Sequence, residues 1–196
     1  MDAWDFQPDV ALSLLPFNAL TGSDSTSFLA GHSKKSAFKI FLENFKLLST
    51  LGKDSFTTDT LQDCEKFICK IYNANDAETT NEARTILFKR GVKAELLPPT
   101  SDALKWHIIR AHHQSMIWLK SLESHPDIIP PTQSGWQEDG NSLKPILLTL
   151  DPMPENVFKL ISCSCKKQCS TLRCSCRKAN MSCTGCCKCK GQCLNK

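Results

Sequence analysis

The sequence predicts a mostly α-helical chain made of a small helical unit, a Pro-rich extended connector, and a small cysteine-built domain with little regular secondary structure. Apolar residues recur at spacings of three and four over residues 7–123, the period of helices packed around a core. Six prolines then fall within residues 124–160, and ten of the twelve cysteines fall within residues 163–193. The expected segments are a helical unit at 1–58, a helical extension packed on it at 59–123, the connector at 124–160, and the cysteine-built domain at 161–196.

The first segment is expected to hold two helices. Residues 7–20 place Pro8 in the first turn, where its missing N–H costs no hydrogen bond. Residues 33–50 carry phenylalanines at spacings of three and four behind Ser33, a residue type that caps helix N-termini. A turn-rich stretch, TGSDS, separates the two helices.

Three more helices are expected in the second segment. Residues 58–72 and 80–90 each repeat the amphipathic spacing. The longest helix covers 102–123, after LPPT breaks the chain and Thr100 or Ser101 supplies an N-cap. The sequence assigns no role to this segment, and an unknown protein partner of the helical unit remains one hypothesis.

Histidines and cysteines within these helices favour structural roles. His107 and His112 are five residues apart and His113 points in another direction, so they form no i, i+4 ligand pair. Cys64 and Cys69 have no neighbouring cysteine and are expected to be buried apolar side chains.

The connector is predicted to be extended, because prolines and the turn-forming stretch SGWQEDGN interrupt it. Trp136 and the apolar stretch ILLTL are expected to lie on the helical unit.

Charge divides the chain at residue 160. Residues 161–196 contain eight basic and no acidic residues, whereas the remaining 16 basic and 20 acidic residues give 1–160 a net charge of −4. Such a basic end predicts an acidic partner, most commonly nucleic acid. The 41% hydrophobic content argues against a disordered chain.

No stretch reads as a secretory leader or a membrane span, so we expect an intracellular protein without a membrane partner. In a reducing compartment, clustered cysteines indicate a metal site in preference to disulfides.

The cysteine spacing is C-x-C-x3-C-x4-C-x-C-x6-C-x2-C-C-x-C-x3-C. Members of a C-x-C pair are expected to point at a shared centre, and three such pairs favour a polynuclear thiolate cluster with Zn²⁺. Three zinc ions with four ligands each are satisfied by nine cysteines when three of them bridge two ions. Because this segment has few apolar residues, metal binding should supply most of its folding free energy, about 10 kcal/mol or more.

This pattern resembles the CXC (tesmin-type, cysteine-rich) domain. Asn195 matches the final Asn of the family pattern, and Cys186 is a spare cysteine that is replaceable or competes with Cys187 as a further ligand. The resemblance implies three zinc ions, a nuclear location and DNA binding. The matching ligands are Cys163, Cys165, Cys169, Cys174, Cys176, Cys183, Cys187, Cys189 and Cys193.

The residues expected to contact DNA are basic: Arg173, Arg177, Lys178, Lys166 and Lys167. Arg173 stands where the family has a Tyr that enters the minor groove, and arginine suits a narrow, A·T-rich groove. The competing interpretation of these residues is charge balance, because three zinc ions and nine thiolates together carry a charge of −3. Nearby basic side chains also lower cysteine pKa values and so favour the thiolate form.

Three other interpretations stay open. A metallothionein-like zinc buffer would use the same thiolates, and a disulfide scaffold would need an oxidising compartment. The third is a catalytically dead nuclease-like fragment that serves as a DNA or protein interaction scaffold.

The nuclease interpretation rests on a second resemblance, to flap-endonuclease and PIN-like nucleases. Gly22, Ser23 and Asp24 match the end of their metal site. A two-metal nuclease needs several carboxylates, and the first 18 residues cannot supply the missing sheet, so we predict no enzyme activity and a fragment of a longer protein.

In these nucleases a glycine-rich turn before a helix holds a DNA phosphate. Gly31, Lys34 and Lys35 match that turn and give a candidate phosphate contact. The stretch LPPTSDALKWHIIRAHHQSMIWLKS also resembles the end portion of transposon-associated animal proteins that finish in a CXC domain.

Overall fold

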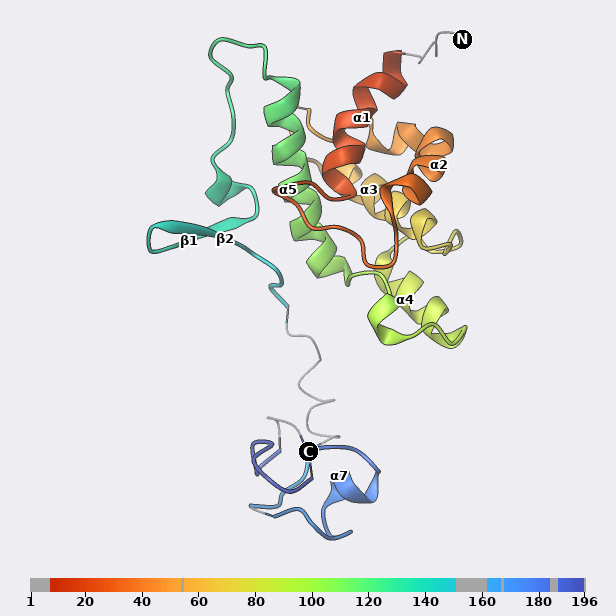
Figure 1. Cartoon of the computed structure of the whole chain (residues 1–196), viewed down its shortest axis with the longest axis vertical. Helices are drawn as coiled ribbons and strands as arrows, with labels where there is room; N and C mark the ends of the chain where they lie inside the picture. The colour runs from red at the N-terminus through yellow and green to blue at the C-terminus, as the bar shows by residue number, and fades with distance from the viewer. Residues whose placement is uncertain (1–7, 54, 151–161, 167, 184–186, 196) are drawn as a thin grey trace. The chain divides into compact units, whose positions relative to one another are not determined.

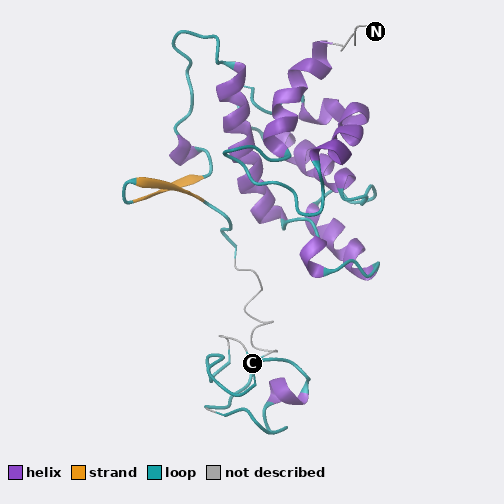
Figure 2. Cartoon of the chain, viewed as in Figure 1, coloured by secondary structure: helices purple, strands orange, loops and turns teal. Residues whose placement is uncertain are grey.

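A computed structural model describes residues 8–53, 55–150, 162–166, 168–183 and 187–195 of the chain. The chain divides into two compact units, Met1–Thr149 and Leu150–Lys196. We call them the helical unit and the cluster unit and describe each by itself. The fold class is confirmed: helices dominate, the strands form one small sheet, and the cysteine-rich unit has little regular structure (Figures 1 and 2).

The helical unit contains the expected helices. Each helix after the first begins behind a Ser or Thr whose hydroxyl accepts a backbone N–H three residues on, namely Ser33, Thr57, Thr79 and Thr100. The α-helices are α1 Pro8–Leu20, α2 Lys34–Asn44, α3 Thr58–Ile71, α4 Thr80–Lys89 and α5 Ser101–Leu119.

Two expected boundaries were wrong. The second helix ends at Asn44 and continues as a 3₁₀ turn, η1 Phe45–Leu48. The last helix ends at Leu119 instead of residue 123, and Leu122, expected on its apolar face, is 99% exposed. The apolar period alone does not locate a helix end, since the backbone can leave the helix before the pattern stops.

One hydrophobic core joins these helices. Figure 1 shows α1 lying alongside α5, and these two helices pack against each other. Phe17 of α1 contacts Phe41 of α2 at 4.7 Å and Phe67 of α3 at 6.4 Å between ring centroids. Leu104 and Ile108 of α5 are fully buried in the same core. Residues from both 1–58 and 59–123 therefore contribute to a single core, while the expected division at residue 58 itself remains untested.

A buried carboxylate fixes the starts of α4 and α5 against α3. Oε1 of Glu65 accepts hydrogen bonds from the Thr80 backbone N–H at 2.8 Å and from the Thr80 hydroxyl at 3.0 Å. It also accepts one from the Ser101 hydroxyl at 2.6 Å. Glu65 thus connects the first residues of α4 and α5 to α3 through a single oxygen.

The three histidines of α5 are buried and bonded to the backbone, as expected for structural residues. Nε2 of His107 lies 2.8 Å from the Leu20 carbonyl, and Nε2 of His113 lies 2.8 Å from the Ile129 carbonyl. Nδ1 of His112 accepts the Gly52 N–H at 3.0 Å.

The two remaining cysteines of the helical unit are also structural. Cys64 and Cys69 are both buried in its core, as expected. Burial raises the pKa of the Cys64 thiol well above its usual range, so this side chain stays neutral.

The connector contains a β-hairpin that the sequence analysis did not predict. Strand β1 Trp136–Asp139 pairs antiparallel with β2 Ser142–Pro145, after a 3₁₀ turn, η3 Pro131–Gln133. Asp139 faces Ser142, which leaves a two-residue loop with Gly140 at φ +60°. A two-residue Gly-Asn loop with Gly at its first position is a known hairpin signal, and the surrounding prolines obscured it.

The expected docking of this region on the helical unit is observed. Arg110 of α5 donates to the Gly135 carbonyl at 3.1 Å and to the Ile146 carbonyl at 2.6 Å. Its guanidinium lies 5.9 Å from the Trp136 ring. Asp102 accepts from the N–H and the hydroxyl of Thr149, each at 2.6 Å. The rest of the expected connector, 151–160, lies outside the described residues.

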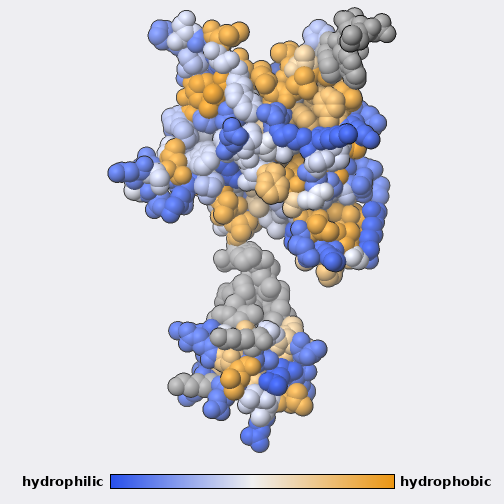
Figure 3. All heavy atoms as spheres, in the orientation of Figure 1, coloured by the Kyte–Doolittle hydropathy of each residue, from blue (hydrophilic) through white to orange (hydrophobic). Residues whose placement is uncertain are grey.

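The cluster unit is mostly irregular backbone around one short helix, α7 Ser175–Lys178. Its turns use residues in the left-handed region, among them Cys169 at φ +29° and Asn180 at φ +55°. Hydrophilic side chains occupy the periphery of the face of this unit displayed in Figure 3. Within the described residues, no helix is long and apolar enough to cross a membrane.

We predict that the helical unit loses stability as the pH falls from 6.5 to 4. Burial, with the charge of His113, holds the pKa of His112 at about 4 in the folded state, whereas a histidine in the unfolded chain titrates near about 6.5. The unfolded state therefore binds the proton first, and the loss reaches at most about 3 kcal/mol near pH 4. All four tryptophans lie in the helical unit, so denaturant titration followed by tryptophan fluorescence measures this unit.

The matched variant is His112→Asn, whose amide oxygen retains an acceptor for the Gly52 N–H but does not titrate. Its unfolding free energy should depend less on pH over this range. Identical pH profiles for the two proteins would contradict the assignment to His112.

Candidate metal centre

The buried side chains in the described part of the cluster unit are all cysteines. Eight of them are at most 8% exposed: Cys163, Cys169, Cys174, Cys176, Cys183, Cys187, Cys189 and Cys193. Cys165 is half-buried and packs against them. Cys186 lies outside the described residues, so its role stays open.

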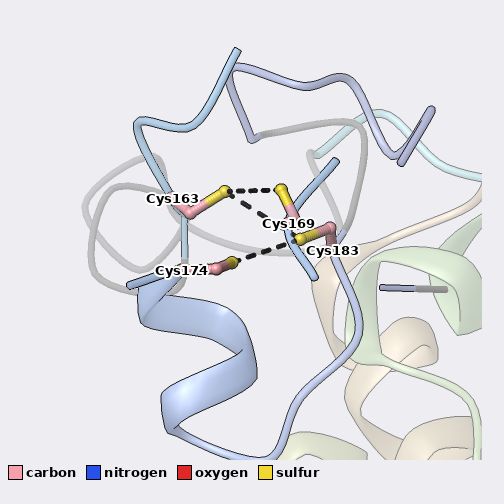
Figure 4. Close-up of side chains that lie close together, drawn as sticks. All are labelled: Cys163, Cys169, Cys174 and Cys183. Atoms are coloured by element: carbon pink, nitrogen blue, oxygen red, sulfur yellow. Dashed lines mark hydrogen bonds between the residues drawn. The ribbon is translucent and has the colours of Figure 1, made fainter. Parts of the chain in front are cut away.

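The sulfur atoms lie at distances that suit a shared metal ion. Cys163 Sγ is 3.9 Å from the sulfurs of Cys169 and Cys183, and Cys174 Sγ is 3.8 Å from that of Cys183 (Figure 4). Cys176 Sγ and Cys187 Sγ are 3.5 Å apart. A disulfide bond would need about 2.05 Å, whereas the sulfurs of a tetrahedral zinc site with Zn–S of about 2.3 Å are about 3.8 Å apart. These cysteines are free thiols arranged at the spacing of metal ligands.

Three overlapping groups of four sulfurs result, and all sulfurs of a group lie within 4.8 Å of one another. Cys183 belongs to all three groups, Cys163 to the first and second, and Cys169 to the first and third. The groups are Cys163, Cys169, Cys174 and Cys183; Cys163, Cys176, Cys183 and Cys187; and Cys169, Cys183, Cys189 and Cys193. This overlap is the arrangement in which a few thiolates bridge several ions.

A C-x-C pair is expected to serve one centre, but two of the three pairs are divided between overlapping groups. Cys174 and Cys176 belong to different groups, and so do Cys187 and Cys189. Cys174 precedes α7 and Cys176 lies inside it. Both sulfurs nevertheless lie within 4.8 Å of those of Cys163 and Cys183, which the two groups share.

The expected lowering of the cysteine pKa values holds only in part. Burial raises the pKa values of the Cys163 and Cys176 thiols to about 12. The nearby backbone N–H of Arg177 lowers the pKa of Cys174 to about 6. A metal ion that binds Cys163 or Cys176 must therefore displace the thiol proton, and binding releases that proton to solvent.

Asn195 supports the sulfur that all three groups share. Its side-chain amide donates to Cys183 Sγ at 3.4 Å and to the Met181 carbonyl at 2.8 Å. The Cys183 N–H in turn donates to the Asn195 carbonyl at 2.7 Å. The sequence analysis gave Asn195 no role, although its position two residues after the last cysteine was the available signal.

Basic side chains surround the cysteines. Arg173, Arg177, Lys178 and Lys166 are exposed, and Lys167 lies outside the described residues. Residues 161–196 contain no acidic side chain that could pair with them.

The candidate phosphate contact of the helical unit has mixed geometry. Gly31 adopts φ +78°, and Lys35 is exposed. Lys34, however, directs its ammonium group to the backbone carbonyl and the side-chain oxygen of Asn18. Ser33 caps α2 through the Ser36 N–H at 3.2 Å. Phosphate binding at this turn remains a prediction.

Asp24, the residue that matches the nuclease motif, is not part of a potential metal site in the described part of the chain. There, the groups of three or more His, Cys, Asp or Glu placed to share an ion consist of cysteines.

Comparison of the chain with known protein families, curated proteins and solved structures finds no match. The geometry of the cysteines is therefore the basis for the functional argument, together with the spacing and charge of the surrounding sequence.

We predict that Asn195→Ala weakens metal binding by about 10- to 100-fold, the usual effect of removing a hydrogen bond to a metal ligand. Competition between the protein and a chromophoric chelator measures this affinity. Gln192→Ala is the control, because it removes an exposed amide of the same type whose backbone N–H still bonds to Cys189. Equal affinities for the two variants would show that Asn195 does not support the cluster.

Proposed function

We propose that this chain is a zinc-dependent DNA-binding protein in which a three-zinc cysteine cluster presents a basic surface to DNA. The observation that carries the proposal is the set of three overlapping buried cysteine groups inside a segment, 161–196, that has basic but no acidic residues. In this proposal the protein is a nuclear, non-enzymatic member of the CXC class. The helical unit supports the DNA-binding unit or contacts a protein partner.

Zinc is the preferred ion because it favours four thiolates in tetrahedral geometry and does not change oxidation state. The overlap pattern supports a count of three ions, one for each group. A thiolate ordinarily bridges two ions, so Cys183 serves the second and third groups and leaves the first with three ligands. Half-buried Cys165 packs against the same cluster and completes the first group.

In this arrangement Cys163, Cys169 and Cys183 each bridge two ions, and the other six cysteines each bind one. All twelve ligand positions are filled without Cys186. The proposed cluster carries a charge of −3, so the eight basic residues of 161–196 leave that segment net positive.

DNA is the preferred partner because basic side chains are exposed in 161–196, which has no acidic residue. Arg173 immediately precedes Cys174, and this exposed guanidinium suits the negative potential of a narrow, A·T-rich minor groove. Arg177 and Lys178 lie on α7 three and four residues beyond Cys174, and Lys166 follows Cys165. We propose that these three residues and Lys167 contact DNA phosphates.

The zinc count is tested by native mass spectrometry of the full chain. We expect three zinc ions in the wild type and in Cys186→Ser, and fewer than three in Cys165→Ser, because only Cys165 is a ligand in the proposed arrangement. If Cys165→Ser keeps three zinc ions and Cys186→Ser loses one, then Cys186 is a ligand and Cys165 is not.

DNA binding is tested by fluorescence anisotropy with a labelled A·T-rich duplex at several salt concentrations. Affinity should fall steeply with salt, since phosphate contacts release counterions, and should vanish after zinc is removed with a strong chelator. A zinc-loaded protein that does not bind DNA would indicate a metal buffer. Cleavage of flap DNA in the presence of Mg²⁺ would indicate a nuclease.

A further inference from the structure

A polar hollow of about 380 Å³ lies on the cluster unit beside α7. Its lining comes from the last turn of α7, the turn that follows, and the end of the chain. The lining residues are Arg177, Asn180, Met181, Ser182, Leu194 and Asn195. Its volume falls at the lower end of pockets that hold small molecules, about 300–1,000 Å³, so it has room for a phosphate group.

Hydrogen bonds fix the walls of this hollow. The Met181 N–H donates to the Cys176 carbonyl at 2.9 Å, and the Asn195 side chain donates to the Met181 carbonyl at 2.8 Å. The Cys183 N–H bonds to the Asn195 carbonyl at 2.7 Å. The turn at 180–182 thus lies between two candidate metal ligands, Cys176 and Cys183, and is hydrogen-bonded to Asn195. The hollow is therefore built on the same backbone that positions the cysteines.

The side chains of the hollow suit an anion. Arg177, Asn180 and Ser182 are exposed and offer a guanidinium, an amide and a hydroxyl, all of which commonly contact DNA phosphates. The planar fork of arginine can donate two parallel hydrogen bonds to one phosphate. No acidic side chain of 161–196 competes for it. Met181 and Leu194, 40% and 73% exposed, add apolar surface at the edge of the hollow.

The competing role for Arg177 is to balance the charge of the cluster, since it directly follows Cys176. That role accounts for a cation near the sulfurs. It does not account for the amide and hydroxyl that converge on the same hollow, because neither group carries charge. The two roles also differ in consequence: a counterion of the cluster affects metal binding, whereas a phosphate ligand affects DNA binding.

We propose that this hollow binds one backbone phosphate of duplex DNA, with Arg177 donating in bidentate fashion and Asn180 and Ser182 completing the contact. The inference rests on the proposed DNA-binding function and names one place where the backbone is held. The contact positions the protein on the duplex and carries no sequence information.

The test compares Arg177→Gln with Lys188→Gln in the zinc-loaded full chain, using fluorescence anisotropy at several salt concentrations. Lys188 is an exposed basic residue of the same unit that does not line the hollow, so both variants lose one charge. Arg177→Gln should bind about 10-fold more weakly or worse. It should also reduce the slope of log affinity against log salt by about 0.9, the value for one lost phosphate contact. Lys188→Gln should change both quantities less.

Two further variants distinguish a built site from diffuse charge. Arg177→Lys keeps the charge but not the fork, so it should retain the salt slope and recover only part of the affinity. Ser182→Ala removes a neutral donor and should weaken binding by about 2- to 5-fold at every salt concentration without changing the slope. Native mass spectrometry should find the wild-type zinc content in all four variants.

Equal losses in Arg177→Gln and Lys188→Gln would overturn the hollow as a site, and so would loss of zinc in Arg177→Gln. In both cases DNA binding by the wild type would leave the proposed function standing. A zinc-loaded wild type that does not bind duplex DNA would overturn the proposed function, and this inference with it.

Discussion

The cluster unit depends on the packing of cysteine sulfurs, because every buried side chain in its described part is a cysteine. Short thiol side chains bury little apolar surface, and a unit of this size cannot offset its conformational entropy with so small a core. Metal–thiolate bonds supply the missing free energy in small domains of this kind. The left-handed turns at Cys169 and Asn180, and the hydrogen bonds from Asn195 to the Cys183 sulfur and Met181, are features that follow from bringing these sulfurs together.

The helical unit is stabilised in a different way. Phenylalanine and leucine fill its core, hydroxyl side chains cap its helices, and Glu65 joins three of them through a single oxygen. None of these interactions needs a metal ion. We therefore expect the two units to respond to different conditions: the cluster unit to metal supply and thiol chemistry, and the helical unit to histidine protonation. A shared chain thus joins a part that folds by hydrophobic burial to a part whose fold is expected to depend on metal.

Sequence patterns predict local features and fail where the outcome depends on distant ones. The three–four spacing and the hydroxyl caps located the helices, since both act within one or two turns. The end of α5 was missed because Leu122 continues an apolar pattern after the helix stops. The β-hairpin was missed because prolines flank its Gly-Asn turn. Cysteine spacing identified the candidate ligands but not their grouping. That grouping depends on where α7 begins and on the turns at Cys169 and Asn180, which bring residues from 163 to 193 together.

The lack of acidic residues in 161–196 is consistent with the proposed charge of the cysteine cluster. A cluster of three divalent cations and nine thiolates is an anion, so nearby carboxylates would repel it, whereas lysine and arginine stabilise it. In the proposed cluster, these lysine and arginine side chains lie on a backbone that metal–thiolate bonds hold in place. They would therefore bind a partner without the entropic cost of ordering a flexible basic tail. Charge balance and DNA binding are therefore compatible uses of one surface. What distinguishes a specific contact from general charge is the presence of neutral donors beside a cation, and the Arg177 hollow combines them.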